Sequence, residues 1–373
     1  MVTFFQRWFL WSWSAHAGIF RHSQLLRRRL GLALDILKAN LAERSRPYKL
    51  TFAVTNRCNS RCAICGIWQK PVDGKELTTQ EIITFLTRND RFSWIDLTGG
   101  EVAERPDAPD IVEAVMRHQR RLFHLHIPTN GLNHPAIMTL VRTVLLANPP
   151  LFTLTISLDG PPALHDRLRG CPGNWSACLR LFAELRPLCH AGFRMFFGFT
   201  LSHLNAGEFP ATVRAAQEHL PGIDIHDFHI NLAHRSAHYY GNTNREWPPL
   251  SREPYAHDLA WFRQHQRRFL DPIAFLERRF LRLAPVFLDH GNSPHPCQSL
   301  ASSVFLDPTG QVYPCTIWDH PLGNIREHAY HLAPILAAAR TTRERVRAGE
   351  CPRCWSPCEA YPSLLVNRFT RER

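Results

Sequence analysis

From Tyr48 onward, short apolar runs alternate with stretches in which apolar residues recur at helical spacing. The apolar runs predict six strands, at residues 49–55, 94–97, 122–127, 152–158, 194–201 and 224–231. Helical patterns lie between most of them, at residues 79–87, 108–119, 135–146, 177–189 and 209–219. Repeated units of strand and helix favour a parallel sheet, either open or closed into a barrel, and so indicate an α/β fold.

The chain after the sixth strand carries a different pattern. Residues 235–290 are rich in His, Arg, Trp and Tyr and predict two helices, at 255–269 and 272–283, which we interpret as a bridge. Beyond the bridge, the segment SSVFLDPTGQVYPC predicts a hairpin with Pro-Thr-Gly as its turn.

The N-terminal stretch, residues 1–20, is apolar and rich in aromatic residues, and a basic amphipathic run, residues 21–46, follows it. Polar residues interrupt the apolar stretch too often for a membrane-spanning helix, which needs roughly 20 apolar residues in a row. A signal peptide would carry its charge before the apolar region, whereas here the charge follows it. The pattern fits a segment lying in a membrane interface, which implies peripheral membrane contact, or alternatively a helix packed across the fold.

The composition is that of an ordinary globular protein of two or three domains, with 373 residues, 45% hydrophobic and 20% charged. Its net charge of +12 suggests an acidic partner, a membrane surface or nucleic acid. We interpret the basic runs, at 21–46, 263–282 and 340–347, mainly as solvated helix faces. Eight of the eleven cysteines fall in two clusters with metal-ligand spacing, which indicates metal binding in a reducing compartment, the cytoplasm.

The first cysteine cluster follows the first predicted strand. Cys58, Cys62 and Cys65 form a C-x3-C-x2-C array in the run TNRCNSRCAICGIW. Three closely spaced thiolates can hold three corners of a cubane iron–sulfur cluster and leave the fourth iron without a protein ligand. Such an open iron is a chemical site, whereas a cage of four cysteines would mainly store an electron or staple the fold.

The second cysteine cluster lies in the tail. Cys297 and Cys315 flank the predicted hairpin, and Cys351, Cys354 and Cys358 follow in a C-x2-C-x3-C array. Taken alone, this set fits a structural zinc site, because zinc favours four-cysteine sites with C-x2-C knuckles. The remaining cysteines are interpreted as ordinary buried or loop residues: Cys171, Cys178 and Cys189.

Further motifs follow the first array in a fixed order: Gly99-Gly100-Glu101, Thr129-Asn130-Gly131 and Ser157-Leu158-Asp159-Gly160. Together they resemble the radical S-adenosylmethionine (radical SAM) enzymes, and the tail resembles the SPASM or twitch extension of that family, over roughly residues 47–360. The resemblance implies a partial (β/α)6 TIM-like barrel with a small C-terminal iron–sulfur domain. The domain boundaries it implies are an N-terminal helical segment (1–46), the barrel (47–234), the helical bridge (235–290) and the auxiliary-cluster domain (291–373).

The resemblance also implies cofactors. The three-cysteine [4Fe–4S] cluster would bind S-adenosyl-L-methionine (SAM) and cleave it reductively to a 5′-deoxyadenosyl radical. The tail would bind an auxiliary [4Fe–4S] cluster rather than zinc, through Cys297, Cys315, Cys351 and Cys354, with Cys358 spare or substituting.

Contacts to SAM are implied at the ends of the strands. Gly99, Gly100 and Glu101 match the turn that binds its ammonium group, with the glycines allowing close approach of the backbone. Ser157 and Arg169 match positions that contact its carboxylate or ribose.

Other residues near these motifs are open to two interpretations. Arg169 could instead pair with Asp166 on a helix, and Asn130 could offer its amide to SAM or simply form an Asn-Gly turn. The residue before the third cysteine is often aromatic in the family, whereas here it is Ile64, and Trp68 could supply the missing aromatic surface. Three residues at the end of the sixth strand are candidates to contact the substrate: His229, Asn231 and His234.

The resemblance therefore implies an enzyme that abstracts hydrogen from a small-molecule or lipid-linked substrate. The main expectation is one-electron oxidation through the auxiliary cluster, and the alternative is a redox-neutral epimerisation or rearrangement. An external electron donor such as flavodoxin or ferredoxin is implied, and nucleic acid is not expected as a partner. One alternative is a maturase of ribosomally synthesised peptides (RiPPs). A second alternative, from another class, is a zinc-stapled basic nucleic-acid-binding protein, which would explain the net charge but not the open three-cysteine array.

Overall fold

A computed structural model describes residues 25–40, 46–72, 74–248, 251–266 and 271–366. Its strands form one nine-stranded sheet in the order β6-β5-β4-β3-β2-β1-β7-β8-β9. Among the first six strands, each strand pairs in parallel with the next one in the sequence. They are β1 (Lys49–Thr55), β2 (Trp94–Gly99), β3 (His124–Thr129), β4 (Leu151–Ser157), β5 (Phe193–Leu201) and β6 (Phe228–Leu232). This is the predicted α/β architecture.

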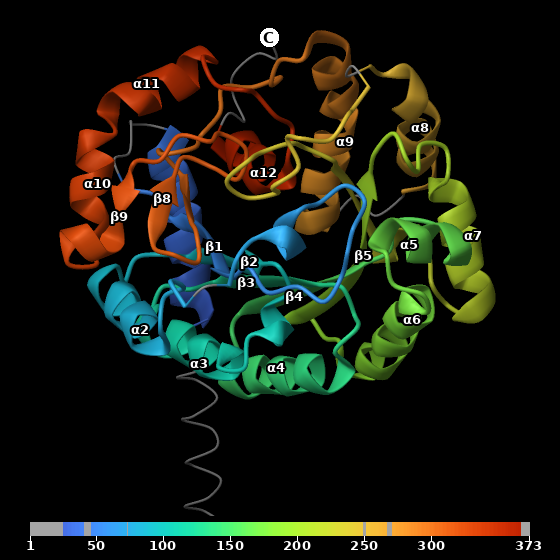
Figure 1. The fold of residues 1–373 in the computed structure, drawn as a ribbon, viewed down its shortest axis with the longest axis horizontal. Coiled ribbons are helices and arrows are strands. Elements are labelled where there is room, and N and C mark those ends of the chain that lie inside the picture. Colours follow the sequence, from blue (N-terminus) through green and yellow to red (C-terminus); the bar gives the residue numbers. More distant parts are fainter. Residues whose placement is uncertain (1–24, 41–45, 73, 249–250, 267–270, 367–373) are drawn as a thin grey trace, which may run out of the picture.

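Helices follow the strands and cover the outer face of the curved sheet (Figure 1). They are α2 (Thr79–Arg88), α3 (Ala108–His118), α4 (His134–Ala147), α5 (Pro162–Arg169), α6 (Asn174–Leu185) and α7 (Phe209–His219). Buried positions alternate along β3, where Leu125 and Ile127 point into the core while His124 and His126 are half-buried on the other face. The inner face of the barrel is therefore polar, and His124 and His126 each pair there with a threonine of β4.

The barrel is partial, because β6 does not pair with β1. Helix α9 (Pro272–His290) lies at the free edge of β6, where the Glu277 carboxylate accepts a hydrogen bond of 2.9 Å from the amide of Ile230. Glu277 also accepts a hydrogen bond from the hydroxyl of Tyr361 on α12 (Pro357–Val366). A buried side chain thus accepts a backbone hydrogen bond at an edge where, in a closed barrel, another strand would pair.

The C-terminal region extends the barrel sheet directly. Strand β7 (Ser303–Leu306) pairs in parallel with β1, and β8 (Gln311–Tyr313) and β9 (Gly323–Asn324) continue in antiparallel fashion. The hairpin predicted from SSVFLDPTGQVYPC is present as β7 and β8. Three further α-helices lie in the chain after β6: α8 (Ala256–His265), α10 (Leu332–Ala338) and α11 (Arg340–Ala348).

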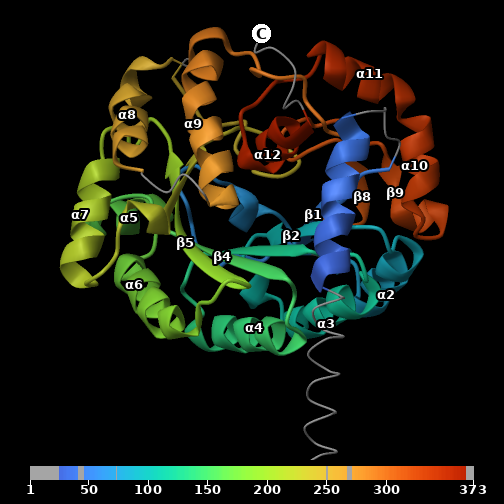
Figure 2. The same ribbon diagram turned by 180° about the vertical axis from the view of Figure 1, so that it is seen from behind.

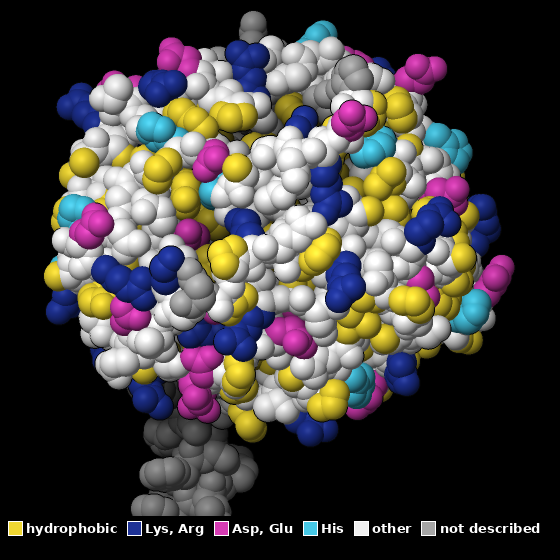
Figure 3. Space-filling view, in the orientation of Figure 1, with side chains coloured by type: hydrophobic (Ala, Val, Ile, Leu, Met, Phe, Trp, Pro, Cys, Tyr) yellow, Lys and Arg dark blue, Asp and Glu magenta, His cyan; other side chains and the backbone are white. Residues whose placement is uncertain are grey.

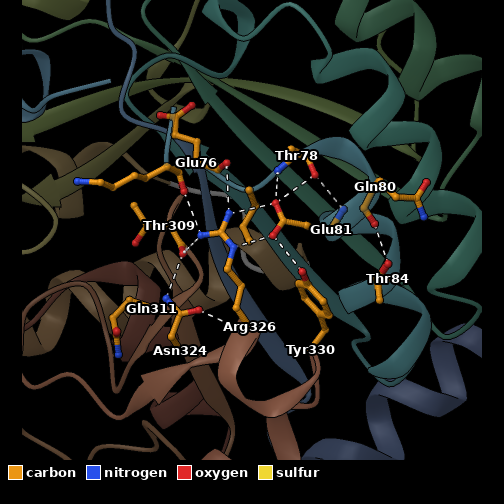
Figure 4. A network of polar contacts seen from close by, with 12 residues as sticks. Glu76, Thr78, Gln80, Glu81, Thr84, Thr309, Gln311, Asn324, Arg326 and Tyr330 are labelled. Atoms are coloured by element: carbon orange, nitrogen blue, oxygen red, sulfur yellow. Dashed lines mark hydrogen bonds and ion pairs between the residues drawn. The ribbon is translucent and has the colours of Figure 1, made fainter. Parts of the chain in front are cut away.

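One arginine joins the C-terminal region to the barrel (Figure 4). The Arg326 guanidinium donates to both carboxylate oxygens of Glu81, at 2.6 and 3.0 Å, and to the carbonyls of Lys75 and Thr309, at 3.1 and 2.9 Å. Glu81 in turn forms a capping box with Thr78 at the start of α2. The preceding Glu76 accepts a 2.6 Å hydrogen bond from the amide of Asn56, two residues before the first cysteine. The network therefore connects the tail to the start of the cysteine loop.

A helix over residues 25–40 packs against the barrel at the amino ends of the strands, opposite the cysteine loop. Its buried Asp35 accepts hydrogen bonds from Ser93, just before β2, and from Arg121, three residues before the start of β3. Part of the N-terminal expectation, residues 1–24 and 41–45, lies outside the described residues. Among the described residues, no helix combines the length and the hydrophobicity that crossing a membrane requires.

Most element boundaries lie within four residues of the prediction. Helix α9 differs more, since it runs on to His290 rather than ending at residue 283, and two further differences concern β6 and α5. Residues 224–227 form a 3-10 turn rather than the start of β6, because Asp224 and Asp227 make a capping box there. Helix α5 was not predicted, since it spans only eight residues and shows little apolar periodicity.

Candidate functional site

The ends of the parallel strands surround a cavity of about 210 Å³. All three cysteines of the first array line it, together with each residue for which a SAM contact is predicted: Gly99, Gly100, Glu101, Asn130, Ser157 and Arg169. Motifs that are separated by more than a hundred residues in sequence thus share one cavity, because parallel strands bring their carboxyl ends to the same edge.

The two glycines of the second strand end pack against the cysteine loop. The Gly100 amide donates to the Thr55 carbonyl at 2.8 Å, and the Glu101 amide donates to the Arg57 carbonyl at 2.7 Å. A Cβ atom at Gly99 would lie 2.2 Å from the Thr55 carbonyl oxygen, and one at Gly100 would lie 2.1 Å from that of Arg57. Glycine is therefore required here to let the cysteine loop approach β2, a reason that differs from the close approach to a ligand expected from the motif.

The segment after β6 holds the cysteine loop from its other side. The Arg245 guanidinium donates to the carbonyls of Cys62 and Cys65, at 3.3 and 3.1 Å, and also to that of Ala63. The Asn242 amide donates to the Ile64 carbonyl at 2.8 Å. Four successive carbonyls, those of residues 62–65, are thus bound by two side chains about 180 residues away in sequence.

Glycine is also required at this second contact. The Gly66 amide donates to the Tyr240 carbonyl at 2.6 Å, and a Cβ atom at Gly66 would lie 2.2 Å from the Gly241 carbonyl oxygen. Neither Arg245 nor Asn242 was predicted as part of the site, because the loop that carries them has no periodic pattern.

Without metal, the thiols of the first array are protonated. Burial raises the pKa of Cys58 to about 12 and that of Cys65 to about 11, and it also raises the pKa of Cys62. The Arg169 and Arg245 guanidinium groups oppose this effect at Cys65, since their charges favour the thiolate. Binding of iron would therefore release protons and would be helped by these two cations.

Arg169 lies between the cysteine loop and the fourth strand end. It forms a 2.5 Å ion pair with Asp159 rather than with Asp166, and its Nη1 lies 3.8 Å from the Cys62 sulfur. Asp166 instead accepts hydrogen bonds from the amides of Gly173 and Trp175. The Arg169 Nε atom is buried and has no hydrogen-bond partner among the described residues, so a donor remains available to an anionic group in the cavity.

Glu101 provides a buried carboxylate on the other side of the cavity. It accepts hydrogen bonds from the amides of Asn130 and Ala103 and from the Thr129 hydroxyl, at 2.7, 3.2 and 3.1 Å. Burial still raises the pKa of Glu101 to about 7. Its charged form would gain from a cationic ligand group.

The side chain of Asn130 is engaged by the protein. Its amide donates to Asn59 at 2.6 Å and to Ser60 at 2.9 Å, and its oxygen accepts from the amide of Leu132. Asn130 therefore fastens the cysteine loop to the third strand end as well as lining the cavity.

The sixth strand end contributes two of its three predicted residues. Asn231 and His234 line the cavity, and the Asn231 Oδ1 and His234 Nε2 atoms are buried without a hydrogen-bond partner among the described residues. His229 does not line it but stacks on Phe196 inside the barrel, with ring centroids 3.8 Å apart. Ile64 and Trp68 both line the cavity, so the aliphatic residue and the tryptophan share one wall.

Two adjacent tyrosines line this cavity on the side of the C-terminal region. The Tyr239 hydroxyl lies 2.8 Å from the Thr98 hydroxyl, and the Tyr239 and Tyr240 rings lie 4.7 Å apart. Tyr239 also packs edge-on against Phe305 of β7, with ring centroids 5.2 Å apart, and burial raises the pKa of both tyrosines. The two tyrosines therefore lie where the cavity meets the C-terminal region, a position that the sequence did not indicate.

Four of the five tail cysteines share one cavity, and the fifth lies outside it. Cys297, Cys315, Cys351 and Cys354 line a second cavity, of about 620 Å³, and Cys358 does not. The Cys358 carbonyl instead accepts a 2.5 Å hydrogen bond from Lys49, a buried residue that pairs with Asp96 at 2.9 Å. The arrangement favours the four cysteines predicted as ligands and leaves Cys358 as the spare one.

The residues of both cavities fit the implied groups. In the first cavity, the buried Glu101 carboxylate and the unpartnered Arg169 Nε complement the two ends of an amino acid such as the methionyl part of SAM. Among the described residues, no three His, Cys, Asp or Glu side chains converge as ligands of one ion. A cubane cluster distributes its ligands over different irons, so the spread cysteines do not conflict with it. All eleven cysteines are free thiols.

The fold and the cavities define a partial-barrel iron–sulfur protein with two cysteine sites. The comparisons with known proteins then give its family: residues 52–216 match the radical SAM superfamily, and residues 297–358 match an iron–sulfur cluster-binding domain, SPASM. The chain belongs to the radical SAM superfamily and carries a C-terminal SPASM domain. The predicted enzyme class, the partial barrel and the cofactors, a SAM-binding [4Fe–4S] cluster and an auxiliary cluster, are confirmed. The zinc-stapled alternative loses its basis.

Two relatives from Bacillus subtilis cover most of the chain. The antilisterial bacteriocin subtilosin biosynthesis protein AlbA is 24% identical over 76% of this chain, and the sporulation killing factor maturation protein SkfB is 23% identical over 82%. The chain spans 58% and 68% of their respective lengths. An AdoMet-dependent heme synthase from Oleidesulfovibrio alaskensis is 24% identical over 74% of this chain and 72% of its own length.

The fold is also similar to solved structures. The crystal structure of Streptococcus suis SuiB bound to the precursor peptide SuiA superimposes with a TM-score of 0.53, at 13% identity, over 84% of this chain and 70% of the SuiB chain. At this identity the likeness shows the fold alone. The individual ligand and SAM-contact residues, and the domain boundaries, stay predictions.

Proposed function

We propose that this protein is a radical SAM/SPASM maturase that modifies a peptide by abstracting a hydrogen atom from an unactivated carbon. The observation that carries this proposal is the similarity to AlbA and SkfB over 76% and 82% of this chain, because these relatives are named for bacteriocin biosynthesis and for maturation of a killing factor. The alternative drawn from the sequence, a peptide maturase, is therefore better supported than the small-molecule or lipid-linked substrate first expected.

The residues of the first cavity have separate roles in this proposal. Cys58, Cys62 and Cys65 would hold the first cluster, Glu101 would accept from the ammonium group of SAM, and Arg169 would donate to its carboxylate. When bound, SAM and the cluster supply a hydrogen-abstracting group, and the auxiliary cluster supplies an acceptor for one electron. Asn231 and His234, whose buried polar atoms lack partners among the described residues, would orient the substrate.

The proposal extends to location and to the electron source. Free thiols in all eleven cysteines suit the reducing cytoplasm, and an external donor such as flavodoxin or ferredoxin would deliver the electron that reduces the first cluster.

Mass spectrometry of candidate peptides tests the proposal. The enzyme would be co-expressed with each short open reading frame next to its gene, and an oxidative modification would lower the peptide mass by two hydrogens. The matched control is the Cys58→Ala, Cys62→Ala, Cys65→Ala variant, which should leave the peptide unchanged. Unmodified peptides, combined with turnover of SAM on a small-molecule fraction, would refute the peptide assignment.

The second candidate is a small-molecule or lipid-linked substrate. The similarity to an AdoMet-dependent heme synthase over 74% of this chain favours it. Deuterium transfer from labelled candidate substrates to 5′-deoxyadenosine would distinguish the two, because only the true substrate donates its label.

A further inference from the structure

The helix over residues 25–40 carries four exposed leucines on one face. Their exposed fractions are 57%, 53%, 49% and 50%, for Leu26, Leu30, Leu34 and Leu37. Spacings of four, four and three residues place them in one stripe along the helix. The other large exposed apolar side chains of the described residues, Leu146 and Phe275 among them, lie singly on other elements. A contiguous apolar stripe marks a contact surface.

The opposite face of this helix holds it on the barrel. Asp35 is 2% exposed, pairs with Arg121 at 3.0 Å and accepts from the Ser93 hydroxyl at 3.0 Å. Near the end of the helix, the Asn40 amide donates to the Leu365 carbonyl of α12 at 3.2 Å. The orientation of the helix is thereby fixed, and the leucine stripe faces outward.

Basic residues flank the stripe on both sides. At about 100° per residue, Arg27 and Lys38 lie along one border of the stripe and Arg29 along the other, and all three are exposed. The acidic residue of this helix, Asp35, is on the docked face. An exposed apolar stripe bordered by cations, with no exposed acid within residues 25–40, is the pattern of a helix that lies in an anionic lipid interface.

We propose that this helix binds the surface of an anionic membrane, with the four leucines in the acyl boundary and the three cations at lipid phosphates. The sequence just before it supports the same partner, since residues 1–20 include three tryptophans, a residue type favoured at membrane interfaces. A two-fold dimer through this stripe is disfavoured, because it would bring Arg27, Arg29 and Lys38 against their own copies.

The contact would tether the enzyme without delivering lipid to the cavity. The helix docks on residues that precede β2 and β3, whereas the cavity lies at the other ends of the strands. Figure 2 accordingly shows the helix in front of the sheet, and Figure 1, from the opposite side, shows the cysteine loop in front. On that cavity face, basic and acidic side chains are interspersed (Figure 3). Membrane binding therefore does not require a lipid substrate.

Co-sedimentation of the full-length holoenzyme with vesicles tests the proposal. Wild-type protein should sediment with phosphatidylglycerol vesicles and far less with phosphatidylcholine vesicles. A Leu30→Glu, Leu34→Glu variant should have a vesicle partition coefficient at least about tenfold lower than wild type, because two leucine side chains would no longer insert into the membrane. The matched control is Leu146→Glu on α4, an equally apolar site with 87% exposure, which should bind like wild type.

Charge-reversal variants and added salt provide a second test of membrane binding. An Arg27→Glu, Arg29→Glu variant should lose binding to phosphatidylglycerol, and added salt should weaken wild-type binding. Light scattering in solution and iron content should stay unchanged in every variant.

The proposal is overturned if wild-type protein stays in the supernatant. A supernatant dimer that the Leu30→Glu, Leu34→Glu substitutions dissociate would show that the stripe contacts a second copy instead. Equal sedimentation of that variant and wild type would also overturn it, because another part of the chain would then make the contact. Either failure leaves the peptide-maturase proposal intact, since that rests on the opposite end of the barrel.

Discussion

At the scale of single residues, the position of Cys358 separates it from the other tail cysteines. It lies outside the cavity that Cys297, Cys315, Cys351 and Cys354 share, and its carbonyl is held by the buried Lys49. We predict that Cys358→Ser retains the iron of both clusters, whereas Cys354→Ser loses about four irons per chain. Iron and sulfide analysis after anaerobic purification measures this. Loss of the auxiliary cluster in Cys358→Ser would show that the fifth cysteine is a ligand.

A second residue-scale prediction concerns Arg245. Its guanidinium holds the carbonyls of the cysteine loop and places a positive charge near an anionic cluster. In Arg245→Ala we expect a lower iron content at the first site and a more negative reduction potential. The reduced cluster carries more negative charge than the oxidised one, so the loss of a nearby cation destabilises the reduced form more. Arg245→Lys should recover the charge but only part of the loop geometry. Both are followed by redox titration with electron paramagnetic resonance.

The matched control for Arg245 is Arg252→Ala, a largely exposed arginine of the same bridge that pairs with Asp289. It should change neither iron content nor potential. An unchanged potential and iron content in Arg245→Ala would show that the contact to the loop is dispensable.

Residues of the site differ in how far the sequence indicates them. Cys58, Cys62 and Cys65 were predictable, because a short spacing within one loop fixes their proximity. Arg245, Asn242 and the two tyrosines were not, since their contacts depend on how a long non-periodic loop folds back. For Arg169 the pattern offered Asp166, a helical neighbour, but the structure pairs it with Asp159 across the strand end.

At the scale of elements, the network of Arg326 and Glu81 joins the tail to α2. The hydrogen bonds from Arg326 lower the pKa of Glu81 to about 2, from an ordinary value of 4.5. The ion pair therefore stabilises the folded protein above about pH 4.5, and this contribution is lost as the pH falls from 4.5 towards 2. We predict that Glu81→Gln is about 1 kcal/mol less stable near neutral pH, with less effect in high salt.

Urea denaturation of the wild type and of Glu81→Gln as a function of pH measures this difference. The gap between the two should narrow below about pH 4.5. The control is Glu344→Gln, whose partner Arg340 is 82% exposed on α11 and should contribute little. A gap that does not depend on pH would mean that the Glu81 charge does not stabilise the joint.

Secondary structure was largely predictable because apolar periodicity governs it. Strand β1 has the predicted ends, since every residue from Lys49 to Thr55 is buried and the polar Asn56 follows. The short helix α5 escaped prediction, because eight residues with two prolines at its start show little amphipathic signal. The boundary of β6 was misplaced because capping by Asp224 is a local hydrogen-bond effect that periodicity does not report.

At the scale of the whole molecule, the family resemblance predicted the partial barrel but not how the tail attaches to it. The C-terminal region, expected as a small iron–sulfur domain, joins the barrel sheet, because β7 pairs with β1 and three strands extend the sheet there. Strand pairing between segments some 250 residues apart leaves no mark in local patterns. The pairing also brings β7 beside the first cavity, where the Phe305 ring packs against that of Tyr239.

The central claim is that the first cysteine array forms a SAM-cleaving site distinct from the auxiliary one. The most direct measurement is the release of 5′-deoxyadenosine from SAM by reduced, anaerobically purified protein. Wild-type protein should release it and contain about eight irons per chain, and the Cys58→Ala, Cys62→Ala, Cys65→Ala variant should release none while keeping about four irons. A colourless wild-type protein, or a triple variant that still produces 5′-deoxyadenosine, would contradict the account.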